Sequence, residues 1–150
     1  MKYATKLTSH FGVYALVFDA SGEKLLMIRK ARGCYTGRYD LPGGGMEPHE
    51  LLEETLVRET FEETGCYITA FEQLGVFSDL FPHKIDGSPV TLRHIGAIYT
   101  ASISGTPRAT GDGTDDSDGC LWIPVAELNE KNTVPLILHA LKKHAETAAA

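Results

Sequence analysis

Alternating and continuous apolar positions predict strands in the first part of the chain. From Phe11 to Ala31 the sequence FGVYALVFDASGEKLLMIRKA indicates two strands joined by a turn, because DASGE is rich in turn-forming residues. The first strand is apolar on both faces, which is typical of a strand buried within a sheet. The stretch RGCYTGRYDLPGGG that follows has the glycines and proline of a loop.

A helix is expected from about Pro48 to Thr64. Proline suits the first turn of a helix, Glu47 and Glu50 suit its positive end, and Gly65 supplies a stop. Strands are expected at 66–78 and 91–103, with a loop at 79–89 between them, and a short strand at 120–124. Helices are expected at 124–130 and 134–146. This order predicts a mixed β-sheet with helices on its faces, in one α/β domain over residues 1–150.

Composition narrows the class of protein and its location. Hydrophobic residues make up 43% of the 150 positions and charged residues 23%, which is ordinary for a globular protein. No apolar run approaches the roughly 18 residues that span a bilayer, and the N-terminus lacks the apolar block of a signal peptide. We therefore expect a cytoplasmic protein without a membrane partner. Its three cysteines form no CxxC pair, which fits reduced thiols.

Charge argues against one class of partner. The net charge of −6 is unfavourable for long nucleic acids, which usually need a basic face. Basic residues nevertheless gather between Lys24 and Arg38. That cluster could meet a small anionic ligand, or it could be a solvated strand edge guarded by Lys and Arg. Both interpretations stay open at this point.

The glutamates of the expected helix are the strongest chemical signal. At about 100° per residue, Glu59, Glu62 and Glu63 share the face on which Leu51, Leu52 and Leu56 lie one to three turns earlier. Glu53 and Glu54 point elsewhere and suit a solvated face. No Lys or Arg is expected on the acidic face, so its carboxylates need a cation or must take up protons. Three such oxygen donors suit a hard divalent ion such as Mg²⁺.

The segment from Gly44 to Cys66 resembles the Nudix box of MutT-like enzymes, G-x5-E-x7-R-E-U-x-E-E-x-G-U, where U is a bulky aliphatic residue. Every fixed letter matches, while Thr60 and Cys66 depart from the U positions. The resemblance implies an α/β/α sandwich and a hydrolase that acts on a nucleoside diphosphate linked to another group. It also implies Mg²⁺ or Mn²⁺ held by Glu59, Glu62, Glu63 and the backbone oxygen of Gly44. Glu50 and Arg58 are expected to pair and brace the loop before the helix.

The substrate and its phosphate contacts are less defined. Arg29, Arg32 or Arg38 could hold phosphate oxygens through two parallel hydrogen bonds, and the sequence does not choose among them. A nucleoside triphosphate, an oxidised nucleotide and an ADP-sugar all stay open, as does a homodimer. The alternative is a catalytically silent, Nudix-like regulator that binds a nucleotide. Such regulators usually lose box glutamates, and this chain keeps them all.

The general base is expected from an aspartate-rich segment, GDGTDDSDG, which holds Asp112, Asp115, Asp116 and Asp118. Asp118 is the first choice and Asp116 the second, because residues near a strand end are held most rigidly. The alternative is a solvated turn, in which aspartate is a common turn former. The predicted catalytic set is therefore Glu59, Glu62, Glu63 and Asp118.

Overall fold

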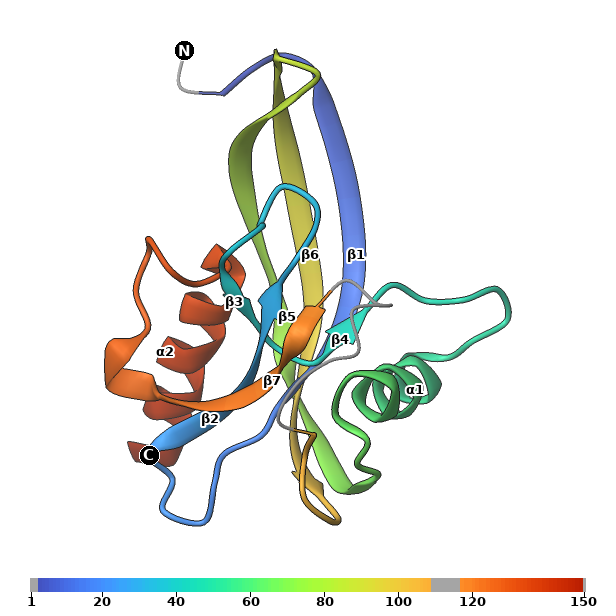
Figure 1. Ribbon diagram of the computed structural model, residues 1–150, viewed down its shortest axis with the longest axis vertical. Helices are drawn as coiled ribbons and strands as arrows, with labels where there is room; N and C mark the ends of the chain where they lie inside the picture. The colour runs from blue at the N-terminus through green and yellow to red at the C-terminus, as the bar shows by residue number, and fades with distance from the viewer. Residues whose placement is uncertain (1–2, 109–116, 150) are drawn as a thin grey trace.

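Strands of two small sheets lie between two helices (Figure 1). The computed structural model describes residues 3–108 and 117–149. The elements in chain order are β1 (Leu7–Leu16), β2 (Lys24–Lys30), β3 (Tyr39–Asp40), β4 (Gly43–Gly44), α1 (Leu52–Thr64), β5 (Ile68–Ile85), β6 (Ser88–Ile103), β7 (Ser117–Pro124), η1 (Val125–Glu127) and α2 (Pro135–Ala149). Figure 1 shows α1 and α2 on opposite sides of the strands, which confirms the predicted α/β sandwich.

The strand pairing is mixed, as predicted. One sheet has the order β4-β1-β6-β5 and the other the order β3-β2-β7. β1 runs parallel to β6, whereas the other paired strands are antiparallel. Backbone hydrogen bonds link the sheets, from Leu26 N to Val17 O at 2.9 Å and from Ala15 N to Pro42 O at 2.8 Å.

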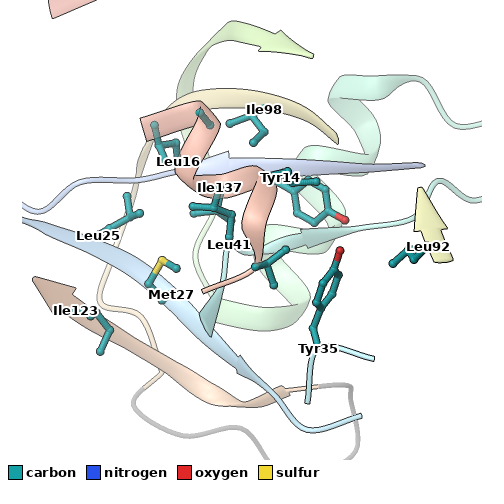
Figure 2. Packing of buried hydrophobic residues seen from close by; sticks show 13 residues of the cluster. Tyr14, Leu16, Leu25, Met27, Tyr35, Leu41, Leu92, Ile98, Ile123 and Ile137 are labelled. Atoms are coloured by element: carbon teal, nitrogen blue, oxygen red, sulfur yellow. The ribbon is translucent and has the colours of Figure 1, made fainter. Parts of the chain in front are cut away.

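Apolar side chains fill both faces of β1, as its sequence predicted. Tyr14 and Leu16 on one face pack into a core that contains Leu136 and Ile137 of α2 (Figure 2). Val13, Ala15 and Val17 on the other face belong to a second core, which contains Leu56 of α1. The two cores hold each helix against its own side of the strands. Within the described ranges, neither helix has the length and apolar character that a membrane crossing requires.

The expected loop at 79–89 is wrong. These residues belong to a long hairpin in which β5 and β6 pair from Ile68↔Ile103 to Ile85↔Ser88. Its turn has Asp86 and Gly87 at φ 49° and 81°. A two-residue Asp-Gly turn with positive φ matches the twist of the flanking strands. Pro82 is tolerated because β5 lies at the edge of its sheet.

Three other boundaries also differ from the expectation. The segment 124–130 forms only the short 3₁₀ helix η1, and the glycine-rich loop before α1 contains the two-residue strands β3 and β4. The first helix begins at Leu52 rather than near Pro48, because His49 has φ 66°, outside the helical region. Leu51 is the N-cap and is 69% exposed, so its expected place on the inward face is also wrong.

Candidate active site

A cavity of about 420 Å³ opens where the end of α1 meets β1, β2 and the glycines of β4. Its lining combines acidic, basic and backbone groups that are far apart in the sequence. The lining residues are His10, Tyr14, Lys30, Arg32, Asp40, Gly43, Gly44, Gly45, Glu59, Glu62 and Glu63. The three glutamates that share one face of the predicted helix therefore do meet in a single cavity, together with Gly44.

The three glutamates differ in burial along the face of α1. Glu63 is 8% exposed, the side chain of Glu59 is 17% exposed and that of Glu62 is 52% exposed. Burial raises the pKa of Glu63 well above its usual range, although a hydrogen bond from Gly43 N opposes the shift. Burial also raises the pKa of Glu59. The inner end of the cavity thus disfavours uncompensated negative charge.

Backbone glycines bring the main chain close to these carboxylates. Gly43 N donates to Glu63 Oε1 at 2.8 Å. At Gly44, an added Cβ would lie 2.9 Å from Glu59 Oε1, closer than real Cβ contacts come. A larger residue at this position would push the Glu59 carboxylate out of its present place. Within the PGGG stretch, Gly43 therefore donates a backbone hydrogen bond to Glu63, and Gly44 leaves room for the carboxylate of Glu59.

Arg58 braces the loop before α1, as the resemblance implied. Its Nε donates to Glu50 Oε2 at 2.6 Å, and its Nη2 donates to Glu50 Oε1 and to Gly45 O, both at 3.0 Å. Glu50 also accepts from Thr55 Oγ1 at 2.6 Å and from Glu47 N at 3.0 Å. Hydrogen bonds from Arg58 and then from Glu47 N lower the pKa of Glu50 to about 2.

The same guanidinium reaches the acidic face, which corrects the expectation that no cation lies there. Arg58 Nη1 donates to Glu59 Oε1 at 2.9 Å and to Glu62 Oε2 at 3.2 Å. Among the described residues, no three His, Cys, Asp or Glu side chains are grouped so that they could hold a metal ion as they stand. The contacts give the reason: two carboxylates turn toward Arg58, while Glu63 turns toward the backbone of Gly43.

Basic side chains also line the cavity. Lys30 ends β2, and Arg32 follows two positions later. His10 of β1 joins them, and burial followed by the charge of Lys30 lowers its pKa. The sequence had suggested Arg32 as a phosphate contact and included Lys30 only in the basic cluster, and it missed His10. Lys30 is the last residue of β2 and Arg32 lies beyond it, so the strand pattern did not choose between Lys30 and Arg29.

The other two predicted arginines are engaged outside the cavity lining. Arg29 Nη2 donates to Tyr39 Oη at 2.9 Å, and the guanidinium lies over the ring of Tyr39. Arg38 Nη1 donates to the carbonyl oxygens of Glu130 at 2.7 Å and Thr133 at 3.1 Å. These contacts give Arg38 a bracing function, tying the loop before β3 to the segment before α2.

Asp40 is a cavity residue that sequence reasoning missed. It lies in β3, is 4% exposed and accepts a hydrogen bond from Leu41 N at 2.8 Å. Burial raises its pKa to about 6, against the opposing charge of Lys30. A short strand inside a glycine-rich stretch gave no pattern from which to find it.

The aspartates proposed as general base fall largely outside the described part of the chain. Asp112, Asp115 and Asp116 lie outside the described residues, and so does the side chain of Asp118. The backbone of Asp118 belongs to β7, where the preceding Ser117 pairs with Lys30. The strand that carries Asp118 therefore runs beside a residue that lines the cavity.

The donor set fits a hard divalent cation. The carboxylates of Glu59, Glu62 and Glu63 are oxygen donors, and the glycines of β4 keep backbone beside them. Lys30 and Arg32 can bind anionic oxygens in the same cavity. A metal-binding group and a phosphate-binding group in one cavity are the requirements for cleaving a phosphoanhydride.

Comparisons with known proteins agree with this chemistry. The family model described as NUDIX domain matches residues 8–143. The chain is 42% identical over 95 residues to the ADP-ribose pyrophosphatase of Methanocaldococcus jannaschii, covering 63% of this chain and 53% of that protein. It is 27% identical over 132 residues to the oxidized purine nucleoside triphosphate hydrolase of Mus musculus, a match that covers 87% of this chain and 81% of that protein.

A solved structure shares the fold over nearly its whole length. The crystal structure of a MutT NUDIX hydrolase from Burkholderia pseudomallei superposes with a TM-score of 0.68 at 22% identity, covering 91% of this chain and 98% of that one. At that identity the likeness concerns the fold alone. The family match over residues 8–143 completes the assignment: the chain belongs to the NUDIX domain family, the family of the Nudix hydrolases.

Proposed function

We propose that this protein hydrolyses a pyrophosphate bond in a nucleoside diphosphate linked to another group, with Mg²⁺ or Mn²⁺ as cofactor. The observation that carries the proposal is the single cavity in which the carboxylates of Glu59, Glu62 and Glu63 meet Lys30 and Arg32. The substrate class is an oxidised or normal nucleoside triphosphate, or an ADP-sugar. Relatives named for ADP-ribose and for oxidized purine nucleoside triphosphates support this range.

The metal would be held by Glu59, Glu62 and Glu63, with the backbone oxygen of Gly44 as a further donor. When bound, such an ion neutralises phosphate charge and lowers the pKa of a water ligand. Glu59 and Glu62 each give one carboxylate oxygen to Arg58 Nη1, so a bound ion would use the second oxygen of each carboxylate or compete with Arg58 for the first. Arg58 thus keeps these carboxylates compensated in the metal-free protein and continues to hold Glu50 when the metal binds.

Lys30, Arg32 and His10 are proposed to bind the phosphate oxygens. Lys30 and Arg32 supply positive charge, and His10 supplies a ring nitrogen that can donate a hydrogen bond. Water attacks one phosphorus atom, and the bond to the bridging oxygen breaks. The products are a nucleoside monophosphate and the phosphorylated second group, or pyrophosphate when the substrate is a triphosphate cleaved at its α-phosphorus.

Asp118 remains the proposed general base, with Asp116 as second choice. The pairing of β7 with β2 brings the backbone of this segment beside Lys30, where Ser117 is the paired residue. Asp118→Asn should lower kcat much more than it raises KM. If Asp→Asn variants at positions 112, 115, 116 and 118 all keep turnover within about threefold, roughly 0.65 kcal/mol in barrier height, the base is a carboxylate of the box instead.

A nucleotide panel tests the function directly. The purified chain is incubated with 8-oxo-dGTP, the normal triphosphates and ADP-ribose, in Mg²⁺ and in EDTA, and the products are separated by chromatography. We expect Mg²⁺-dependent monophosphate from one class, and loss of at least about 100-fold in Glu63→Gln, as removal of metal-held charge stabilisation implies. Binding of a nucleotide without any turnover would support the regulator instead.

A further inference from the structure

Three buried side chains form a hydrogen-bonded row behind the cavity. His94 of β6 is 2% exposed, and both of its ring nitrogens have partners. Nε2 lies 2.7 Å from Tyr14 Oη, and Nδ1 lies 3.1 Å from Tyr35 Oη. Figure 2 shows the hydroxyl ends of Tyr14 and Tyr35 pointing toward one another. Tyr14 also lines the cavity, so the row connects the core to the site.

Two glycines make this position of Tyr14 possible. Gly12 of β1 and Gly96 of β6 face each other in the parallel ladder. A Cβ at Gly12 would overlap the Tyr14 hydroxyl, and a Cβ at Gly96 would lie 3.1 Å from Tyr14 Cε2. The ring of Tyr14 therefore folds back over both strands and carries its hydroxyl to His94. Any larger residue at Gly12 would move the hydroxyl away.

The neutral His94 ring carries one N–H proton, on Nε2 or on Nδ1. Which nitrogen carries it decides whether Tyr14 accepts a hydrogen bond from His94 or donates one to it. Burial lowers the pKa of His94 to about 3, so the ring is neutral at neutral pH. A neutral imidazole has one N–H donor and one bare acceptor nitrogen. One tyrosine must then accept from His94 while the other donates to it. If Tyr14 accepts, its own O–H is left to donate elsewhere.

The position of Tyr14 favours the arrangement in which Tyr14 accepts. Tyr14 lines the cavity, where its O–H can donate to a ligand oxygen, whereas Tyr35 is not among the lining residues. Burial, and after it the carboxylates of Asp40 and Glu63, raise the pKa of Tyr14, so its hydroxyl keeps its proton at neutral pH. In this arrangement Tyr35 donates to Nδ1, which lies 3.1 Å from its hydroxyl oxygen.

We propose that His94 is a positioning residue for substrate binding: its Nε2–H donates to Tyr14 Oη, which directs the Tyr14 O–H into the cavity. There the hydroxyl donates to an acceptor oxygen of the bound nucleotide, either a phosphate or a sugar oxygen. The inference rests on the proposed function in one respect, that the ligand of the cavity is a nucleotide. It assigns Tyr14 as a substrate contact and His94 as the residue that orients it.

Nitrogen NMR tests the orientation without any turnover. The ¹⁵N shifts of the His94 ring in the metal-free protein report which nitrogen carries the proton, and the signals are assigned by their loss in His94→Gln. We expect the Nε2-protonated form. A ring protonated at Nδ1 would overturn the proposal, since Tyr14 would then have to donate to His94.

Kinetics and binding test the consequence for the substrate. Tyr14→Phe keeps the ring over the glycines and should raise KM about tenfold with kcat within about threefold. His94→Leu should raise KM similarly, whereas His94→Gln, whose amide can still donate to Tyr14, should restore most of the affinity. Tyr99→Phe is the matched control, because its buried hydroxyl accepts from Gln73 Nε2 on the other face of the sheet.

Thermal melting of each variant identifies any that fail to fold. If His94→Leu does not fold, the KM of Tyr14→Phe tests the proposal by itself. An unchanged KM in Tyr14→Phe would overturn the proposal. If the wild-type protein cleaves nothing, calorimetric binding of a non-hydrolysable nucleotide with a methylene bridge replaces KM. Weaker binding by Tyr14→Phe would then support the inference while the proposed hydrolysis fails.

Discussion

Replacing Asp40 with asparagine should stabilise the protein at pH 8. Asp40 is 4% exposed and has one hydrogen bond to the backbone, from Leu41 N. Asparagine has nearly the same shape, and its side-chain oxygen can keep that bond. The substitution removes a charge whose burial is unfavourable, so the folded state gains more than the unfolded state.

The magnitude follows from the pKa of the carboxyl. Burial raises the pKa of Asp40 from 3.8 to about 6. At 1.36 kcal/mol per pKa unit, the ionised carboxylate costs the folded state about 3 kcal/mol. Because the folded pKa is the higher one, the folded state binds the proton more tightly. The stabilisation of the folded state by the protonated Asp40 carboxyl is fully present below about pH 4, and it is lost as the pH rises through about 6.

Urea unfolding of Asp40→Asn and wild type, measured from pH 4 to pH 8 in EDTA, gives the difference. We expect a gain of about 3 kcal/mol at pH 8, or roughly 6–12 °C in melting temperature for a chain of this size. The gain should shrink below about 1 kcal/mol at pH 4, where the wild-type carboxyl is protonated in the folded state.

The control is Asp19→Asn. A hydrogen bond from Ser21 lowers the pKa of Asp19, so neutralising it should bring no gain at pH 8. A gain in Asp40→Asn that is equal at pH 4 and pH 8 would refute the electrostatic reasoning, and so would no gain at either pH.

Three further outcomes test the metal site. Glu62→Gln should lower turnover at least about 100-fold. Glu53→Gln, on the exposed first turn of the helix, should leave turnover nearly unchanged. Equal losses of turnover in the two variants would contradict the argument that Glu59, Glu62 and Glu63 share one face. Millimolar Mg²⁺ should raise the melting temperature above that in EDTA, because ligand binding to the folded state adds RT ln(1 + [L]/Kd); no change while the enzyme is active would count against a structured site. Gly44→Ala should weaken metal binding measured by calorimetry, since its Cβ would lie 2.9 Å from the Glu59 carboxylate, whereas Gly45→Ala meets only His10 at an ordinary 3.5 Å and should bind normally.

Local periodicity made the acidic part of the site predictable. Glu59 and Glu63 are four positions apart on one helix, so their shared face follows from the helical repeat alone. The same repeat also places Arg58 beside Glu62, at positions i and i+4, so the helical spacing could have revealed this cation and the sequence analysis overlooked it. The pairing of Arg58 with Glu50 came from the family resemblance, since Glu50 lies before the helix begins.

The strands and turns were predictable only in part. Apolar runs predicted β1 and β2, but a proline and several polar residues concealed the hairpin at 79–89, although Asp86-Gly87 was a usable turn signal. The two-residue strand that carries Asp40 has no periodicity of its own. It forms because Tyr39 and Asp40 pair with Arg29 and Ile28, a contact that depends on the path of the intervening loop.

The sequence by itself determined the family, the α/β class and the shared acidic face, because these follow from residue spacing within one continuous segment and from the order of the predicted elements along the chain. The tertiary structure decided which cations meet that face and which side chains close the cavity. Tyr14 and His94 are 80 positions apart and meet only because β1 and β6 are parallel neighbours with glycines at Gly12 and Gly96. Contacts at such separation follow from strand order and register, which the local pattern of residues does not specify.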